Sequence, residues 1–360
     1  MKTINDFDLR EKKVLVRCDF NVPLDEQGNI LDDFKIKETL PTIKYLIQNE
    51  VKVILMSHLG DPEGEMREDL RMEPIRKKLV QLLGSEVLMA PDCVGKKVEK
   101  MVEEMKEGEV LLLENLRFNK GEEENSDSFS KDLAKLADIY INDAFGTCHR
   151  EHASILGVAK LLPAGAGLLL EKEITTLKKM MENPAKPLIA IIGGEKVETK
   201  ARFINKISEI ADFILISGLI KKEIEEKSPI LSHAEKIIKP VDECERGRDI
   251  GPKTIEIFKE KIKTAKTVFW NGPFGKTEEE EFSRGTQEIA NAIIESKAFS
   301  VVGGGETVEF LSKLNLLSKF NHVSTGGGAM LSFLSGEELP GLEALKWHPS
   351  LSKKQVFSDQ

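Results

Sequence analysis

The sequence contains few cysteines, and their spacing excludes several kinds of site. The four are Cys18, Cys93, Cys148 and Cys244, and no two of them have the spacing of a metal-binding motif. We therefore expect free thiols in a reducing compartment, the cytoplasm, and not a disulfide framework. Nothing around them indicates a catalytic cysteine.

The sequence also lacks long apolar runs and an excess of positive charge. No run reaches the length of a membrane span, and the N-terminal residues lack the apolar core of a secretory signal. The formal net charge is −9, which argues against a general nucleic-acid or membrane binder. We expect neither kind of partner and a monomeric protein, in which any anion site is a local positive patch.

What the sequence does contain is a regular alternation of short apolar runs with longer segments of helical periodicity. The runs are rich in Val, Ile and Leu, and their lengths suit strands that are buried on both faces of a parallel sheet. The expected strands are 14–16, 51–56, 87–89, 110–113, 139–141, 188–192, 213–216, 268–270, 300–302 and 322–324. This alternation predicts an α/β protein with doubly wound parallel sheets.

The length of 360 residues predicts two domains. Residues 171–183 have a helical pattern between a glycine-rich breaker at 164–167 and a proline-rich end at 183–187. We interpret this segment as a hinge helix that joins the domains. The expected parts are residues 1–168, residues 169–335, and a tail of 336–360 that returns to the first domain.

Three expected strands of the second half are followed closely by glycines. These are Gly193 and Gly194, then Gly303, Gly304 and Gly305, then Gly326, Gly327 and Gly328. Glycine lets the backbone approach a ligand closely, and the start of a helix behind it favours an anion. One such turn is a weak signal, because a flexible turn looks the same. Three of them indicate a polyphosphate site.

Polar residues follow four expected strands of the first half. They are Asp19 and Asn21, His58, Arg117, and Arg150. Parallel α/β sheets bind ligands at the carboxyl ends of their strands. Each residue alone is more often structural, but together they suit a small anion with hydroxyl groups. No nucleophile and no zinc-type spacing stands out. A polyphosphate site in one domain and a small-anion site in the other is a kinase-like arrangement.

At these residues the chain resembles the phosphoglycerate kinase family. The matching motifs are Arg-Cys-Asp-Phe-Asn-Val-Pro (17–23), Ser-His-Leu-Gly (57–60), Glu-Asn-Leu-Arg-Phe (114–118), Asn-Asp-Ala-Phe-Gly-Thr-Cys-His-Arg (142–150), Gly-Gly-Glu-Lys-Val-Glu-Thr-Lys (193–200), Trp-Asn-Gly-Pro (270–273), Gly-Gly-Gly-Glu-Thr (303–307) and Ser-Thr-Gly-Gly-Gly-Ala (324–329). The resemblance implies reversible, Mg²⁺-dependent phosphoryl transfer between ATP and the carboxylate of 3-phosphoglycerate, a step of glycolysis. It also implies that the two domains close about the linking helix.

The resemblance assigns roles to the motif residues. In the first domain, the acid would be bound by Asp19, Asn21, Lys35, His58, Arg117 and Arg150. In the second, the nucleotide would be bound by Gly193, Gly194, Lys196, Lys200, Asn271, Glu278, Gly303, Gly304, Gly305, Thr307 and Thr325, with Glu278 on the ribose and Glu306 on the metal. Catalysis would fall to Lys35, Lys196, Gly326 and Gly327. A carboxylate nucleophile is already ionised at neutral pH, so no general base is required.

Two residues of the first domain depart from the family pattern. Lys35 stands where the family has an arginine, and lysine keeps the charge but loses the planar fork. We expect weaker support of the transition state or a changed geometry; a tolerated exchange is the alternative. Asp61 stands where the family has an arginine for the terminal phosphate. Either Arg67 or Arg71 compensates, or the acid lacks that phosphate or carries a hydroxyl or a cation there.

The second domain departs in two places. The segment after Ile216 is shortened where the family builds part of the base pocket, so the resemblance does not predict base selectivity. Glu306 stands where the family has an aspartate, and its carboxylate still offers an oxygen ligand for Mg²⁺. Three functions therefore remain open from the sequence: a phosphoglycerate kinase, a related acyl-phosphate-forming kinase with a different acid, or a non-catalytic nucleotide-binding homologue.

Overall fold

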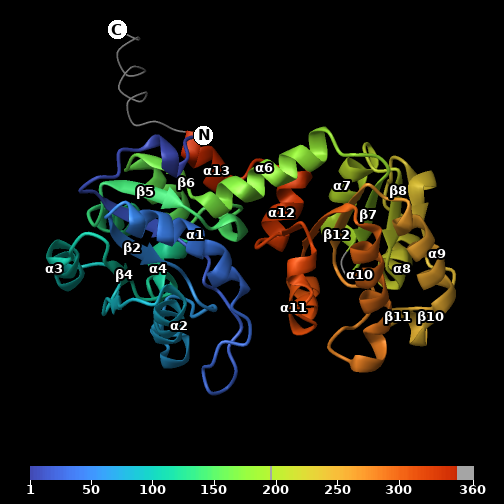
Figure 1. Cartoon of the computed structure of the whole chain (residues 1–360), viewed down its shortest axis with the longest axis horizontal. Coiled ribbons are helices and arrows are strands. Elements are labelled where there is room, and N and C mark those ends of the chain that lie inside the picture. Colours follow the sequence, from blue (N-terminus) through green and yellow to red (C-terminus); the bar gives the residue numbers. More distant parts are fainter. Residues whose placement is uncertain (195–196, 347–360) are drawn as a thin grey trace, which may run out of the picture. The chain divides into compact units, whose positions relative to one another are not determined.

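A computed structural model describes residues 1–194 and 197–346 of the chain, apart from the side chains of 197–199 and of residue 246 (Figure 1). The chain forms two compact units. Unit 1 is Met1–Glu173 with the chain from Glu338 onward, and unit 2 is Ile174–Glu337. Helix α6 (Leu168–Glu182) begins in unit 1 and ends in unit 2, so the division between the units falls within this helix.

Unit 1 contains a six-stranded parallel sheet in the order β3-β4-β2-β1-β5-β6. Its strands are β1 (Lys13–Arg17), β2 (Lys52–Met56), β3 (Val87–Met89), β4 (Val110–Leu112), β5 (Ile139–Asn142) and β6 (Ala164–Ala166). Its helices are α1 (Phe34–Gln48), α2 (Glu73–Leu83), α3 (Lys96–Glu104), α4 (Lys120–Glu123), α5 (Asp127–Ala134) and α13 (Pro340–Lys346). Residues 53–56 of β2 are fully buried. Burial of both strand faces explains why the apolar runs are continuous and do not alternate.

Unit 2 contains a second six-stranded parallel sheet, in the order β14-β13-β12-β7-β8-β9. Its strands are β7 (Leu188–Ile192), β8 (Phe213–Ile216), β9 (Ile237–Ile238), β12 (Thr267–Asn271), β13 (Phe299–Gly303) and β14 (His322–Val323), beside an antiparallel pair of β10 (Glu243–Cys244) and β11 (Asp249–Ile250). Its helices are α7 (Val197–Ser208), α8 (Gly218–Lys227), α9 (Pro252–Lys263), α10 (Arg284–Ser296), α11 (Gly305–Lys313) and α12 (Gly327–Leu334). The predicted α/β fold with two parallel sheets is confirmed.

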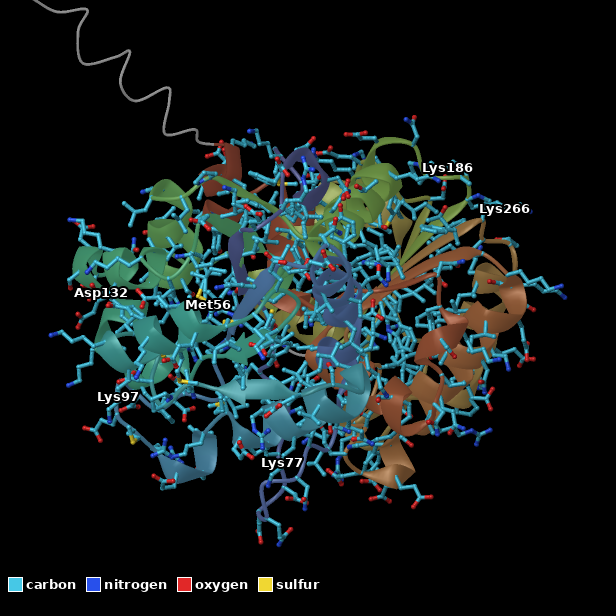
Figure 2. All side chains as sticks on the ribbon, turned by 60° about the vertical axis from the view of Figure 1, so that its left-hand side comes forward. Met56, Lys77, Lys97, Asp132, Lys186 and Lys266 are labelled. Atoms are coloured by element: carbon cyan, nitrogen blue, oxygen red, sulfur yellow. The ribbon has the colours of Figure 1, made fainter. Side chains whose placement is uncertain are left out.

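The two edges of the second sheet differ in chemistry. Lys186 and Lys266 precede β7 and β12 and lie close together at the amino edge (Figure 2), where the Lys266 N–H donates to the Pro187 carbonyl over 2.9 Å. The glycine turns lie at the opposite, carboxyl edge, because they follow their strands. That edge is where the ligands of parallel sheets bind.

One prediction of local structure is wrong. Residues 164–166 were expected to break the chain, but they form β6, which pairs with β5 along Tyr140–Asn142. The strand is short and made of small residues, so it lacks the β-branched pattern that marks a strand. A side chain at Gly165 would collide with the ring of Phe7, so the small residue is required by close packing of the N-terminal segment.

The end of the described chain lies in unit 1. Helix α13 packs on residues 153–160 and on β6, and the Gly341 N–H donates to the Cys148 carbonyl over 2.9 Å. No helix of the described residues is long and apolar enough to cross a bilayer.

A buried carboxyl group caps the start of α6. Asp143 follows β5 and is fully buried, and its Oδ1 accepts hydrogen bonds from the N–H groups of Leu169 (3.0 Å) and Leu170 (3.2 Å). Burial raises the pKa of Asp143 from 3.8 to about 7, because the hydrogen bonds with the Thr42 side chain and with the N–H groups of Leu170 and Leu169 offset only part of the lost hydration.

We expect Asp143→Asn to become relatively more stable as the pH rises. Between pH 3.8 and about 7, Asp143 is protonated in the native state but ionised in the unfolded state. Stability from this group is therefore complete below pH 3.8 and is lost as the pH rises through 7, by at most about 1.4 kcal/mol per pH unit. Urea unfolding at several pH values measures the difference. Asp132→Asn, at the surface of α5 (Figure 2), is the control, and parallel stability curves for Asp143→Asn and the wild type would contradict the expectation.

Candidate functional site

The carboxyl edge of the first sheet gathers the polar residues that follow its strands. Asp19 and Asn21 follow β1, His58 follows β2, Arg117 lies in the short helix Leu116–Phe118 after β4, and Arg150 follows β5. Because the strands are parallel, their carboxyl ends share one edge. Burial lowers the pKa of Arg117, and the charge of Arg150 adds to this shift while Glu123 opposes it.

Lys35 extends this group from the first turn of α1. Its Nζ lies 2.9 Å from Oδ2 of the buried Asp19, in an ion pair. Burial alone would raise the pKa of Asp19, but the charge of Lys35, followed by His58, the Lys35 hydrogen bond and Arg17, lowers it to about 2. Asn21 joins two of the loops, because its Oδ1 accepts the Gly60 N–H over 2.9 Å. Lys35, Asp19 and Asn21 thus form one connected patch.

Arg117 is held by two carboxylates and a carbonyl. Its Nη1 donates to the Gly60 carbonyl (2.8 Å) and lies 3.5 Å from Asp61, while its Nε lies 3.1 Å from Oε1 of Glu123. The Asp61 side chain is 71% exposed. Because 3.5 Å separates it from Nη1 of Arg117, Asp61 lies beside the arginine that the resemblance assigns to an anion.

The two arginines considered as replacements for a positive charge at position 61 have carboxylate partners of their own. Arg67 pairs with Asp69 at 2.6 Å. Arg71 pairs with Glu68 at 2.8 Å and with Glu114 at 3.1 Å. Both arginines are therefore already paired with carboxylates, which gives no support to the idea that they compensate for Asp61.

Sequence reasoning missed three members of this cluster. Arg17, the last residue of β1, is only 1% exposed, and its Nη2 lies 3.3 Å from Nδ1 of His58. His149 and His152 follow β5, and burial followed by neighbouring arginines lowers the pKa of both, that of His152 to about 4. The signal that could have identified Arg17 is an arginine at the end of an apolar run, directly before Asp19 and Asn21.

Two glycine-containing turns meet at the carboxyl edge of the second sheet. The Gly193 N–H donates to the Asn271 carbonyl (2.9 Å), and the Gly194 N–H donates to the Pro273 carbonyl (2.7 Å). A Cβ at Gly193 would clash with the backbone of Pro273, and Gly194 has a φ of +72°. Both positions therefore require glycine, and Asn271 is buried at the junction.

Lys200 of α7 approaches the first of these turns. Its Nζ donates a hydrogen bond to the Gly193 carbonyl and lies 2.9 Å from where a Cβ of Gly194 would be. The Glu306 carboxylate, from the first turn of α11, lies 3.9 Å from the same point. A lysine and a carboxylate thus flank the Gly194 backbone. Lys196, the other lysine predicted here, lies outside the described residues.

A second meeting of glycine turns begins α11 and α12, which lie next to each other (Figure 1). A Cβ at Gly327 would lie 2.8 Å from Cα of Gly304, so the two turns are in backbone contact. A Cβ at Gly305 or Gly328 would meet nothing within 4 Å, so these positions face open space. Gly303 ends β13, and Gly326 precedes α12. The predicted Thr307 and Thr325 are both buried.

The turn at Gly194 and the first turn of α11 border a cavity of about 350 Å³ in unit 2. Its lining includes the predicted Gly194, Glu278 and Glu306. Lys276 and Leu219 also line it and were missed, although Lys276 comes soon after the Asn-Gly-Pro motif. Each unit therefore contains one polar cluster at the carboxyl edge of its sheet: the cluster of unit 1 is rich in arginine and histidine, and that of unit 2 consists of glycine turns, a lysine and carboxylates.

Comparison with known proteins identifies relatives over nearly the whole chain. The family profile described as phosphoglycerate kinase matches residues 4–228 and 221–337. The phosphoglycerate kinase of Dictyoglomus turgidum is 45% identical, covering 95% of this chain and 98% of its own. That of Thermosipho africanus is 43% identical, covering 95% and 97%. The solved phosphoglycerate kinase of Pyrococcus horikoshii has a TM-score of 0.86 at 35% identity, covering 98% of this chain and all of its own.

The comparison also places the shortened region. The alignment to the Dictyoglomus protein spans 388 positions, more than the 360 residues of this chain, so the relative has residues without a counterpart here. The two profile matches meet at residues 221–228, which fall on α8 and its end. With this profile match and these relatives, the chain belongs to the phosphoglycerate kinase family, kinases that transfer a phosphoryl group between ATP and a carboxyl group.

Proposed function

We propose that unit 1 binds 3-phosphoglycerate and unit 2 binds the nucleotide with Mg²⁺. The observation that carries the proposal is that the two units have unlike polar clusters, each at the carboxyl edge of its own sheet. The arginine and histidine cluster of unit 1 suits a small acid with several negative charges. The open N–H groups at the starts of α11 and α12 suit the phosphates of a nucleotide.

On the acid side, Asp19 and Asn21 would accept and donate hydrogen bonds to hydroxyl groups. His58, Arg117 and Arg150 would hold anionic groups. Lys35 would stabilise charge on the phosphoryl group in transfer, since catalysis of this reaction is mainly positioning and charge stabilisation. The acceptor carboxylate is ionised at neutral pH, so none of these residues has to act as a base.

On the nucleotide side, Lys196, Lys200 and the glycine turns 193–194 and 303–305 would bind phosphates, with Gly326 and Gly327 offering N–H groups to the moving phosphoryl. Asn271, Thr307 and Thr325 would also contribute to nucleotide binding, and Glu278 at the cavity would reach the ribose. Glu306 would hold Mg²⁺, which neutralises phosphate charge when bound. No cluster of three His, Cys, Asp or Glu occurs in the described part of the chain, so one carboxylate and the nucleotide's oxygens would share the ion, an arrangement that Mg²⁺ favours.

We expect Lys200→Met to weaken ADP binding roughly tenfold, because a buried ammonium contributes a charge-assisted hydrogen bond to a phosphate. Calorimetry with ADP, with and without MgCl₂, measures the change, and removal of Mg²⁺ is expected to weaken binding by the wild type. Lys206→Met, on the same helix but exposed and paired with Glu209, is the control. Acid binding should be unchanged. Equal ADP affinity in Lys200→Met and the wild type would refute the assignment.

We further propose a monomer that acts in the cytoplasm without a nucleic-acid or membrane partner, in keeping with the net charge of −9. Asp61 beside Arg117 favours a second candidate function, a related kinase that forms an acyl phosphate on an acid without a terminal phosphate. The relative turnover of 3-phosphoglycerate and of unphosphorylated hydroxy acids distinguishes the two.

A further inference from the structure

A chain of buried polar side chains leads from α4 to the acid site in unit 1. It runs from Glu122 through Ser154 and Arg17 to His58, and none of the four is more than 5% exposed. These residues come from α4, from the π-helical turn Ala153–Gly157, from the end of β1 and from the loop after β2. An ionised pair placed so far from water has to satisfy its hydrogen bonds internally.

The direction of each hydrogen bond in this chain follows from chemistry. Arginine can only donate, so Arg17 Nε–H donates to Ser154 Oγ over 2.8 Å. The Ser154 hydroxyl then donates to Glu122 Oε1 (2.6 Å), and the Ser154 backbone N–H donates to Oε2 (2.9 Å). Glu122 thus balances the charge of Arg17 through one serine, and the guanidinium is held in one orientation.

That orientation decides where His58 carries its proton. Arg17 Nη2 lies 3.3 Å from His58 Nδ1, and since the arginine must donate, Nδ1 has to present its lone pair. The proton of the neutral ring is then on Nε2. A doubly protonated ring would set an N–H against the N–H of Arg17. Burial, and next the charge of Arg17, lower the pKa of His58 well below its usual 6.5, with Arg117 and Lys35 adding to this and Asp19 opposing it.

We propose that Glu122, Ser154 and Arg17 are positioning residues that hold His58 as a neutral Nε2–H donor for an oxygen of the bound acid. The proposal rests on the assignment of the acid to unit 1. His58 then contributes a directed hydrogen bond, and the positive charge of the site comes from its arginines and Lys35. Acid binding through His58 is accordingly insensitive to pH across the range in which free histidine titrates.

The same contacts also stabilise the fold locally. Tyr140 donates its hydroxyl proton to the Ser154 carbonyl over 2.8 Å, and Nδ1 of His152 lies 3.8 Å from Oε1 of Glu122. A test therefore needs a readout that a purely structural role would not move. The protonation state of the His58 ring is such a readout.

The first experiment uses the wild-type chain. Long-range ¹H–¹⁵N spectra of ¹⁵N-histidine-labelled protein distinguish the two neutral tautomers and the charged ring, and His58→Gln assigns the signal among the six histidines. We expect the Nε2–H tautomer of His58 without titration from pH 5.5 to 8. An Nδ1–H tautomer, or titration near pH 6.5, overturns the proposal.

The second experiment uses Ser154→Ala to remove the hydroxyl group that links Arg17 to Glu122. We expect a mixture of His58 tautomers and a rise of roughly three- to tenfold in KM for the acid, the effect of one weakened hydrogen bond, with a smaller change in kcat. Ser130→Ala is the matched control. Ser130 is also a buried serine, and its side chain packs against Gly157 of the same π-helical turn. Ser154→Thr keeps the hydroxyl and should restore the single tautomer. A single Nε2–H tautomer and an unchanged KM in folded Ser154→Ala would overturn the proposal.

Two failures can be told apart: that of the positioning role of Glu122, Ser154 and Arg17, and that of the assignment of the acid to unit 1. If titration with 3-phosphoglycerate leaves the His58 Nε2 signal unmoved while its tautomer is as expected, the acid does not bind at His58 and the proposed function of unit 1 is wrong. If the signal moves but the tautomer is not Nε2–H, the assignment of the acid to unit 1 stands and the proposed positioning role is wrong.

Discussion

Replacing Lys35 with methionine is expected to lower kcat roughly 10²- to 10³-fold, the effect of losing one preorganised charge that stabilises the transition state. Lys35 brings a positive charge to the acid site from the first turn of α1 and pairs with Asp19 at 2.9 Å. Methionine keeps the length of the stem and removes the charge. It also leaves a buried carboxylate without its partner, which opposes binding of a negatively charged acid.

Steady-state kinetics with saturating Mg·ATP and 3-phosphoglycerate measure this effect. Lys37→Met, on the same helix and paired with Asp33 at 2.8 Å, makes the same change in charge outside the acid site and should leave kcat within about twofold, as for other exposed ion pairs. Lys35→Arg tests the departure from the family pattern, and we expect it to keep or exceed wild-type kcat because the planar fork can make two hydrogen bonds. A Lys35→Met enzyme with wild-type kcat would exclude Lys35 from catalysis.

Asp61→Arg is expected to lower the KM for 3-phosphoglycerate by a factor of ten or more. Asp61 lies 3.5 Å from Arg117, so it competes with a phosphate for that guanidinium and also repels the phosphate. At roughly 5 Å and an effective dielectric constant near 20, one pair of unit charges is worth about 3 kcal/mol before screening. Since about 1.4 kcal/mol corresponds to a factor of ten, even a strongly screened interaction gives a measurable change.

Two further variants separate the causes. Asp61→Asn removes the repulsion without adding a charge, so it should give only part of the effect. Asp69→Arg makes the same change in net charge at an exposed residue that pairs with Arg67, and it should leave KM nearly unchanged. The Asp61→Arg effect should shrink at high salt. An unchanged KM in Asp61→Arg would show that the acid's phosphate does not bind at Arg117.

Much of the fold could be predicted from local pattern. Ten apolar runs were expected as strands, and each lies on a strand, because burial on both faces of a parallel sheet leaves a continuous apolar run. Strands without such a run were missed. The pattern of residues 164–167 predicts a breaker where β6 lies, and no pattern predicts the two-residue β9 (Ile237–Ile238), because the pairing of both strands depends on neighbours that are remote in sequence.

The candidate sites divide in the same way. The glycine turns were predictable, since positions such as Gly193 and Gly194 tolerate no side chain and leave a mark in the sequence. Asp61, beside Arg117, could be flagged only through the resemblance. The pairing of Arg117 with Glu123 could not be read from the sequence, because a charge run near a strand end is usually a solvated surface.

The sequence by itself determined the two α/β units, the glycine turns and the family, because these depend on periodicity and on local backbone requirements. Only the tertiary structure decided which charges face one another. Arg17 meets Ser154 across 137 positions of sequence, and Asp19 and Asp143 are neighbouring strand-end carboxyls with pKa values near 2 and 7. The physical reason is that burial and charge partners set these states, and both arise only when distant segments pack together.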